Sequence, residues 1–513
     1  MLSNRTVLLA SLLAWPALGG AHSARADTFS VTLGDWGSTS DVGTFAWAIN
    51  QANLSTASDN LITVAPGLKI NVDGAEATSS PNNLATISRS VTIAGNGATL
   101  VGNPEFVTNS GQLVTKTNPQ SPGPKDITVI PSFSVFKVGT YGQANTGLTV
   151  SMTGLNADGL NRIAQVNQGA ILSYSGAAIV NSVNFTGTPT GPSFEAFGAS
   201  LSLSHVSIDN AYGFNGPIGT ALGGIVSGED STINLSDSRI RNTSNLGAVS
   251  LAGGTANIVS TVLTGSGGIS VSGGGSIATG TMNVVNSLVF MQGQMNGGGD
   301  PELAVNRVIA GSGGTMNLTA SSVLVDAISL SGNPAFLNGV PLDANGGRIN
   351  LVSSAVMGTQ IQDTPPQIAY QAGYGGSMTA DVYSWVRPMS AQSATDLRTL
   401  FNQPSLLTGS PGYAIIVLNT NPLIEMIDPY PGEAYPVDGG VLLNVVPNAT
   451  STNQLFSPID GSPILTDVFG NARTRLGLRD VGAVQGIPEP STMLGLLTGL
   501  GALLGVGRRR TVG

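Results

Sequence analysis

Residues 233–240 read Ile-Asn-Leu-Ser-Asp-Ser-Arg-Ile, and the same pattern recurs along the middle of the chain. Its template is a polar residue between two apolar ones, a small hydroxyl residue four positions after the central polar residue, and an apolar residue six positions after it. The six copies are centred on Ser202, Asn234, Asn257, Asn283, Asn317 and Asn350. These centres lie 32, 23, 26, 34 and 33 residues apart, with glycine clusters in the gaps. A period of this size is typical of a solenoid.

We call the residues at one template position, taken across the copies, a column. Two further columns predict how the coils stack. The hydroxyl column contains Ser238, Thr261, Ser287, Ser321 and Ser354, with Val206 in the first copy, and the last apolar column contains Ile208, Ile240, Leu263, Val289, Val323 and Val356. We expect two or three short strands per coil, each paired in parallel with its equivalent one coil away. The aliphatic columns would then stack inside, the asparagines would form a ladder of amides, and the hydroxyls would cap tight turns.

The predicted fold class is all-β, a right-handed parallel β-helix, because the turns of that solenoid accept insertions and the repeat spacing is uneven. The alternative is a β-sandwich or propeller with accidental internal similarity. Antiparallel hairpins would be expected to carry a series of Asn-Gly or Asp-Gly turns, and the sequence shows no such series.

Composition supports this interpretation. Glycine accounts for 69 of 513 residues, only 10% of residues are charged, and there is no cysteine. Ser, Thr, Asn and Gly between apolar positions favour strands and turns over helices. Without cysteine, the fold depends on backbone ladders and packing, since disulfides and cysteine metal sites are excluded. A net charge of −9 argues against nucleic acid as a partner.

The C-terminal residues predict a membrane span. Ile487-Pro488-Glu489-Pro490-Ser491 precedes an uncharged stretch, Thr492 to Val506, which is followed by three arginines. The stretch is slightly shorter than the roughly 20 residues that cross a hydrocarbon core, its start is set by the prolines, and the arginines favour a cytoplasmic end. The alternative is a buried C-terminal helix of a globular domain.

The N-terminal residues predict a cleavable secretory signal peptide. Arg5 gives a short basic start, Val7 to Leu18 form an apolar run, and Ala24-Arg25-Ala26 supplies a small-x-small cleavage pattern. Cleavage after Ala26 would leave Asp27 as the first mature residue.

The C-terminal order of motifs resembles the PEP-CTERM sorting signal of Gram-negative bacteria. The residues that carry the resemblance are Pro488, Glu489, Pro490, Ser491, Arg508, Arg509 and Arg510. The resemblance implies an exosortase-type sorting protease and signal peptidase as partners, transient anchoring in the inner membrane, and a final location at the cell surface or outside the cell. It also implies a structural or adhesive role in an exopolysaccharide or biofilm layer, with exopolysaccharide as a further partner.

Two flanking stretches resemble exported bacterial β-helix proteins, including choice-of-anchor and autotransporter-like members. The first is Gly43 to Asn53 followed by Asp59 to Val64, which the resemblance identifies as a helical cap and first strand. The second is Ser462 to Arg473 with Asp480 to Gln485, which resembles a closing segment but departs from it at Gln485. We therefore expect a signal peptide (1–26), a capped parallel β-helix (27–360), irregular C-terminal coils with the closing segment (361–486) and a sorting signal (487–513).

The sequence assigns no catalytic residue, metal site or cofactor. His205 with Asp209 is the weak candidate for a site, against the interpretation of His205 as a surface residue on a strand. Glu229-Asp230 are interpreted as solvated turn acids. Tyr370, Tyr374, Tyr383 and Trp385 are interpreted as packing residues, with a sugar-binding shelf as the alternative. We expect a non-enzymatic protein, and the rival functions are a polysaccharide lyase or glycoside hydrolase on a β-helix scaffold, or a carbohydrate-binding protein without catalysis.

Overall fold

The structure is a computed structural model. It describes residues 26–72, 86–102, 105–108, 113–115, 127–128, 136–139, 147–158, 171–174, 177–181, 184–186, 194–210, 224–242, 247–265, 268–274, 279–293, 308–327, 342–359, 370–373, 375–380, 384–386, 424–426, 434–436, 446–447, 455–468, 470, 473 and 478–479. The predicted signal peptide up to residue 25 and the predicted sorting signal lie outside these residues.

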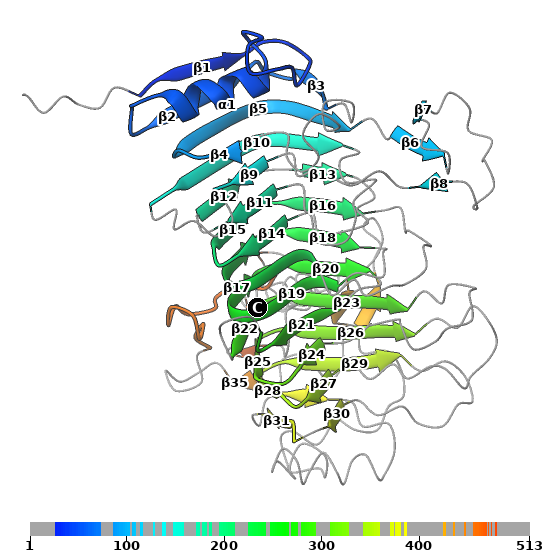
Figure 1. Ribbon diagram of the computed structural model, residues 1–513. Coiled ribbons are helices and arrows are strands. Elements are labelled where there is room, and N and C mark those ends of the chain that lie inside the picture. The colour runs from blue at the N-terminus through cyan, green and yellow to red at the C-terminus, as the bar shows by residue number, and fades with distance from the viewer. Residues whose placement is uncertain are drawn as a thin grey trace, which may run out of the picture.

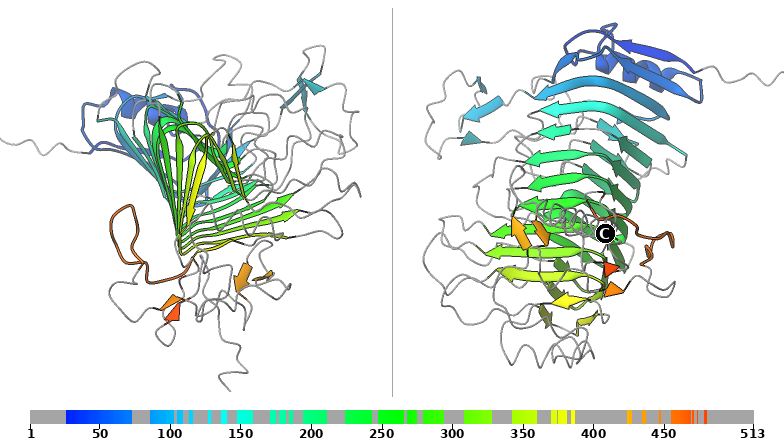
Figure 2. Two further views of the ribbon diagram at one scale, coloured as in Figure 1. Left: turned by 90° about the horizontal axis from the view of Figure 1, so that it is seen from below. Right: turned by 180° about the vertical axis from the view of Figure 1, so that it is seen from behind.

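The described strands form a parallel β-solenoid with three ladders along one axis (Figure 1). Within each complete coil the chain passes the third, first and second ladders in turn, and each strand pairs with its equivalent in the next coil. Ile233, for example, pairs with Leu201 of the preceding coil and with Ala256 of the following one. The prediction of parallel β structure is thus confirmed (Figure 2).

The first ladder contains β1 (Thr28–Val31), β2 (Asn60–Val64), the start of β5 (Val91–Gly102), the start of β10 (Thr149–Asp158), β12 (Ala177–Asn181), β15 (Ser200–Ser204), the ends of β17 (Gly224–Ser236) and β19 (Gly247–Val259), β22 (Gly280–Val285), β25 (Gly314–Thr319), β28 (Arg348–Val352) and β31 (Ser377–Ala380). The second contains β3 (Lys69–Val72), the ends of β5 and β10, β13 (Asn184–Thr186), β16 (Ser207–Asn210), β18 (Arg239–Asn242), β20 (Val262–Gly265), β23 (Leu288–Gly293), β26 (Ser322–Ala327), β29 (Ala355–Thr359) and β32 (Trp385–Val386). The third contains β4 (Thr86–Ile87), β9 (Phe136–Val138), β11 (Ile171–Tyr174), β14 (Phe194–Phe197), the starts of β17 and β19, β21 (Ile269–Ser272), β24 (Val308–Ala310), β27 (Leu342–Asn345) and β30 (Tyr370–Gly373).

The remaining described strands pair outside the three ladders. They form antiparallel groups: β6 (Glu105–Thr108) with β7 (Leu113–Thr115) and β8 (Ile127–Thr128), β33 (Ile424–Met426) with β34 (Ala434–Pro436), and β35 (Val446–Pro447) with β36 (Leu478–Arg479). The three parallel ladders themselves continue past residue 360, as far as β30, β31 and β32.

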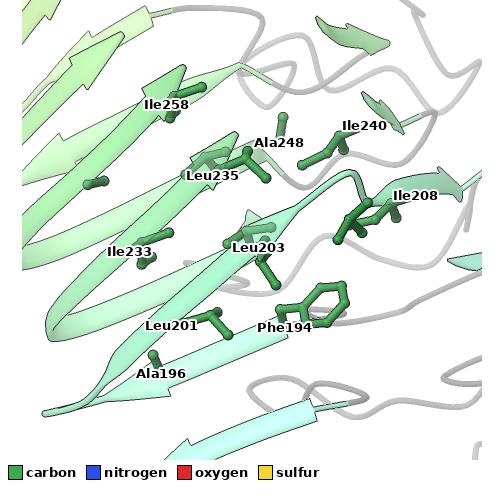
Figure 3. Close-up of a cluster of buried hydrophobic side chains, with 14 of the residues drawn as sticks. Phe194, Ala196, Leu201, Leu203, Ile208, Ile233, Leu235, Ile240, Ala248 and Ile258 are labelled. Carbon is green, nitrogen blue, oxygen red and sulfur yellow. The ribbon is translucent and has the colours of Figure 1, made fainter. Parts of the chain in front are cut away.

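The last apolar column of the repeat forms a continuous interior row on the second ladder. Ile240 pairs with Ile208 on one side and with Leu263 on the other, and the pairing continues through Val289, Val323 and Val356. All six side chains are buried. Figure 3 shows part of the same core, in which side chains of the three ladders point toward one another. Burial of one such side chain contributes about 1.5–3 kcal/mol, so the stacked row is a principal source of stability.

The asparagines of the repeat form the predicted ladder on the outer face of the first ladder. Each Nδ2 donates to the Oδ1 one coil earlier, from Asn257 to Asn234 (2.9 Å), Asn283 to Asn257 (2.9 Å), Asn317 to Asn283 (2.9 Å) and Asn350 to Asn317 (2.8 Å). Ser202 and Thr379 extend the row at its two ends. The amide row thus links successive coils through side chains as well as through the backbone.

The helix α1 (Phe45–Leu54) caps the N-terminal end of the solenoid, as expected. The Thr44 side chain accepts from the Trp47 backbone N–H and starts the helix. Phe45 stacks on Trp36, and both rings lie against Phe136 of β9. Asn53 donates to the Thr86 carbonyl and accepts from the Ser88 N–H. The helix therefore closes the core and satisfies backbone groups in and just after β4.

Candidate functional site

A row of turns with left-handed backbone joins the first ladder to the second. It contains His205, Asp237, Ser260, Asn286, Ala320 and Ser353, whose φ angles lie between 46° and 52°. We call these six residues the turn row. None of them is glycine, although glycine adopts this conformation at the least cost. The repetition of one strained geometry in successive coils shows that the neighbouring contacts hold it in place.

The hydroxyl column of the repeat supplies those contacts. Ser287 Oγ donates to the Val285 carbonyl (2.8 Å) across its own turn and accepts from the Thr261 N–H (3.1 Å) of the preceding coil. Ser321 and Ser354 repeat this arrangement. The predicted turn-capping role of the hydroxyls is confirmed. The bond between coils, which the sequence did not predict, also satisfies a buried backbone donor.

The segment that resembles a closing segment lies on the flank of the solenoid. We call residues 455–468, 470 and 473 the strap. Arg473 is buried, and its Nη2 donates to the Asn286 side-chain oxygen and to the Ala320 carbonyl (3.2 Å). Its Nε donates to the Thr466 carbonyl (2.9 Å), which fixes the guanidinium within the strap. Arg473 therefore joins the strap to the coils centred on Asn283 and Asn317.

A groove follows the first part of the turn row, beside the strap. We call it the corner groove. It has a volume of about 350 Å³ and is lined by His205, Val206, Ser207, Asp237, Ser238, Arg239, Ser260, Val262 and Val468. Val468 comes from the strap, and the other residues come from the turn row and the adjoining ends of the second ladder. Where Arg473 docks, Asn286 and Ala320 are buried, whereas His205 and Asp237 are exposed at the open end.

The structure places His205 in the turn row and Asp209 on β16, four residues further along. The surface interpretation placed His205 on a strand. The structure places it in a turn instead, and it is exposed as that interpretation expected. Its Nδ1 pairs with the hydroxyl of Ser204 (2.8 Å), and Asp209 pairs through its backbone with Arg241. His205 lines the corner groove together with Asp237 and Arg239.

Sequence reasoning did not single out Glu195, on the third ladder. The residue is 3% exposed, and the Oε2 of its carboxyl group has no hydrogen-bond partner within the described residues. Burial, and then the charge of Glu229, raise the pKa of Glu195 to about 8. Glu195 pairs through its backbone with Ser227, and Glu229 pairs with Phe197, so the two acids are diagonal neighbours on adjacent coils. Glu229 is exposed, as expected of a solvated acid, but it lies within β17 and not in a loop as the sequence predicted.

Most of the other predicted site residues lie wholly or in their side chains outside the part of the chain that the structure describes. Ala26 is described and exposed, whereas Ala24 and the whole sorting motif from Pro488 to Arg510 lie outside the described residues. Tyr370 and Trp385 lie on β30 and β32, and Tyr374 and Tyr383 are not described. Among the described residues no group of three or more His, Cys, Asp or Glu side chains could hold a metal ion. No helix among them has both the length and the apolar character that a membrane span requires.

No protein-family model, curated protein or solved structure matches this chain.

Proposed function

We propose that this chain is an exported structural or adhesive protein of the cell surface or extracellular matrix, sorted by an exosortase-type system. The observation that carries the proposal is the solenoid with its stacked asparagine row, which is a long, regular body held together without any cysteine. Such a body repeats its side-chain rows along one axis, which suits a spacer or an extended binding surface. We further propose that the solenoid is right-handed.

The proposed route of export rests on the two termini. Signal peptidase would cut after Ala26, and the apolar stretch 492–506 would hold the chain in the inner membrane until the exosortase-type protease reads Pro488-Glu489-Pro490. The exposed Ala26 precedes β1, so that cut would leave the capped solenoid intact. An exopolysaccharide of the same layer is the proposed partner.

Fractionation of a Gram-negative host that carries an exosortase-type protease tests this route. The full chain is expected at the cell surface or in the medium as a shortened product. A variant with Pro488, Glu489 and Pro490 replaced by alanine should remain at full length in the inner membrane, and a control with Pro365 and Pro366 replaced by alanine should be processed normally. Processing of both variants to the same extent would refute the sorting assignment.

Glu195 supports one rival, a glycan-active enzyme. A carboxyl group whose pKa is raised by burial, with a second acidic residue beside it, is the pairing that glycoside hydrolases use as acid and base. The rival predicts release of reducing ends, or of unsaturated products, from polysaccharides, and loss of that activity in both Glu195→Gln and Glu229→Gln. Purified chain that leaves uronate and neutral polymers intact over a long incubation would remove this rival.

A further inference from the structure

The open end of the corner groove has the composition of a ligand site. Its lining brings a carboxylate (Asp237), a guanidinium (Arg239), an imidazole (His205) and three serine hydroxyls around about 350 Å³. That volume lies within the range of small-ligand sites in proteins. Three coils contribute, so the groove extends over about 10 Å along the axis at a strand spacing of about 4.8 Å. This length is comparable with that of one or two sugar rings.

The strap shows in which direction the turn row presents its polar atoms. The side-chain oxygen of Asn286 and the carbonyl of Ala320 both accept hydrogen bonds from the guanidinium of Arg473, which docks on later members of the same turn row. Asp237 occupies the position of Asn286 two coils earlier, with the same left-handed backbone. Its carboxylate thus occupies the repeat position that faces a bound group, and it makes no hydrogen bond or ion pair with the described residues.

We propose that the open end of the corner groove binds a uronate residue of an acidic polysaccharide. Arg239 holds the sugar carboxylate, because a guanidinium offers paired donors that match the two carboxylate oxygens. The Asp237 carboxylate accepts hydrogen bonds from the ring hydroxyls, and the hydroxyls of Ser207 and Ser260 donate to the ring oxygens or accept from the ring hydroxyls. His205 closes the end of the groove, and since its Nδ1 pairs with Ser204, Nε2 is the ring nitrogen left for the ligand.

Val468 gives the strap a part in this site. It is the one strap residue in the lining, and it comes from the turn Asp467–Gly470, where the Gly470 N–H donates to the Asp467 carbonyl (3.1 Å). Arg473 anchors that turn to the solenoid through Asn286 and Ala320. The strap therefore positions one wall of the groove. This inference names a ligand for the surface role proposed above and rests on that role for its biological meaning.

Calorimetric titration of the full chain with trigalacturonate tests the site, with maltotriose as the neutral probe. Binding of trigalacturonate and not of maltotriose is expected. Arg239→Gln and Asp237→Asn should each weaken binding by about tenfold or more, the usual effect of losing a charge-assisted hydrogen bond. Asparagine tolerates left-handed backbone, so Asp237→Asn should fold normally.

The chain offers matched controls for both substitutions. Arg241→Gln alters the same strand, β18, outside the groove, and Asp230→Asn alters another left-handed aspartate (φ 49°) at a different corner. Both should bind trigalacturonate within about twofold of the unaltered chain. Absence of binding, equal binding of maltotriose, or equal losses in Arg239→Gln and Arg241→Gln would overturn the proposal. A chain that is exported and processed but does not bind refutes only this site, and a chain that binds but stays in the inner membrane refutes only the export route.

Discussion

The guanidinium of Arg473 donates a hydrogen bond to the side-chain oxygen of Asn286, which lies 187 positions earlier in the chain. Asn286 in turn donates from Nδ2 to Ser260 Oγ (3.0 Å), so the contact joins the strap to two successive turns. Buried arginines need such partners, because an unpaired buried charge is costly. One side chain thus holds a distant segment against the flank of the solenoid.

Replacement of Arg473 by glutamine is expected to release the strap and leave the ladders intact. The lost bonds to Asn286 and Ala320 are charge-assisted, which suggests a local loss of about 2–4 kcal/mol. Hydrogen exchange should show faster exchange at residues 455–473 and at the turns of Asn286 and Ala320, with unchanged protection in β15. The exposed Arg348→Gln is the control. Uniform loss of protection in all coils would show that Arg473 does not act locally.

Asn283→Ala should destabilise the solenoid through the asparagine row. The substitution removes the bond to Asn257 and leaves the Asn317 amide without its acceptor, at a cost of about 1–2 kcal/mol. Thr281→Ala, one outward position away on β22, is the matched control, since the Thr281 side chain makes no hydrogen bond with the described residues. Chemical denaturation should show that the free energy of unfolding falls by this amount for Asn283→Ala and by about 0.5 kcal/mol or less for Thr281→Ala. Equal shifts would mean that the row contributes nothing of its own.

Ser287→Ala tests the link between coils at the corner. The buried Thr261 N–H would lose its acceptor, and an unsatisfied buried donor costs about 1–3 kcal/mol. Ser287→Thr should be tolerated better, because Thr261 fills the same column one coil earlier and makes the same bond across its turn. Thermal unfolding of the two variants measures the difference. A threonine variant less stable than the alanine variant would contradict the hydroxyl's role.

Glu195 should make stability depend on pH in a definite direction. Its pKa is raised in the folded chain from about 4.5 to about 8, so the folded state holds a proton that the unfolded state releases between these values. The contribution of protonated Glu195 to the free energy of unfolding is therefore fully present below pH 4.5 and is lost as the pH rises to about 8. The free energy of unfolding of Glu195→Gln should depend less on pH across this window. By linkage, the variant should be more stable than the unaltered chain at pH 7 by on the order of 3 kcal/mol.

Glu229→Gln is the control for this prediction. Burial is the larger cause of the raised pKa of Glu195 and the charge of Glu229 is the smaller one. Most of the pH dependence should therefore survive removal of Glu229. Free energies of unfolding measured from pH 4 to pH 9 provide the comparison, and a Glu195→Gln profile parallel to that of the unaltered chain would refute the assignment.

The repeat could be predicted because it is local. Apolar and polar residues alternate around Asn283, and this alternation indicates which side chains face inward. The same alternation recurs one coil later, so the columns and the asparagine ladder follow from the spacing alone. The cap could be predicted for the same reason, from the apolar face of residues 45–52.

The strap and Glu195 could not be predicted in this way. The partner of Arg473 is a turn residue far away in the sequence, and nothing near Arg473 identifies it. Glu195 follows a buried Phe194 and precedes a buried Ala196, which is the pattern of a solvated outward residue, yet it is itself buried. The left-handed turns lack the glycine that usually signals them, so the turn row also escaped notice.

The central claim is that the coils stack along one axis, and distances between labelled coils test it most directly. Because the chain has no cysteine, spin labels attach only at the cysteines that are introduced. Spin labels on cysteines introduced at Thr232 and Thr315, which are three coils apart, should give a distance of about 14 Å, and labels at Thr232 and Ser377, five coils apart, about 24 Å. Pulsed electron resonance distances that rise by one strand spacing per coil are the predicted result. Distances that do not grow with the number of coils would contradict the stacked solenoid.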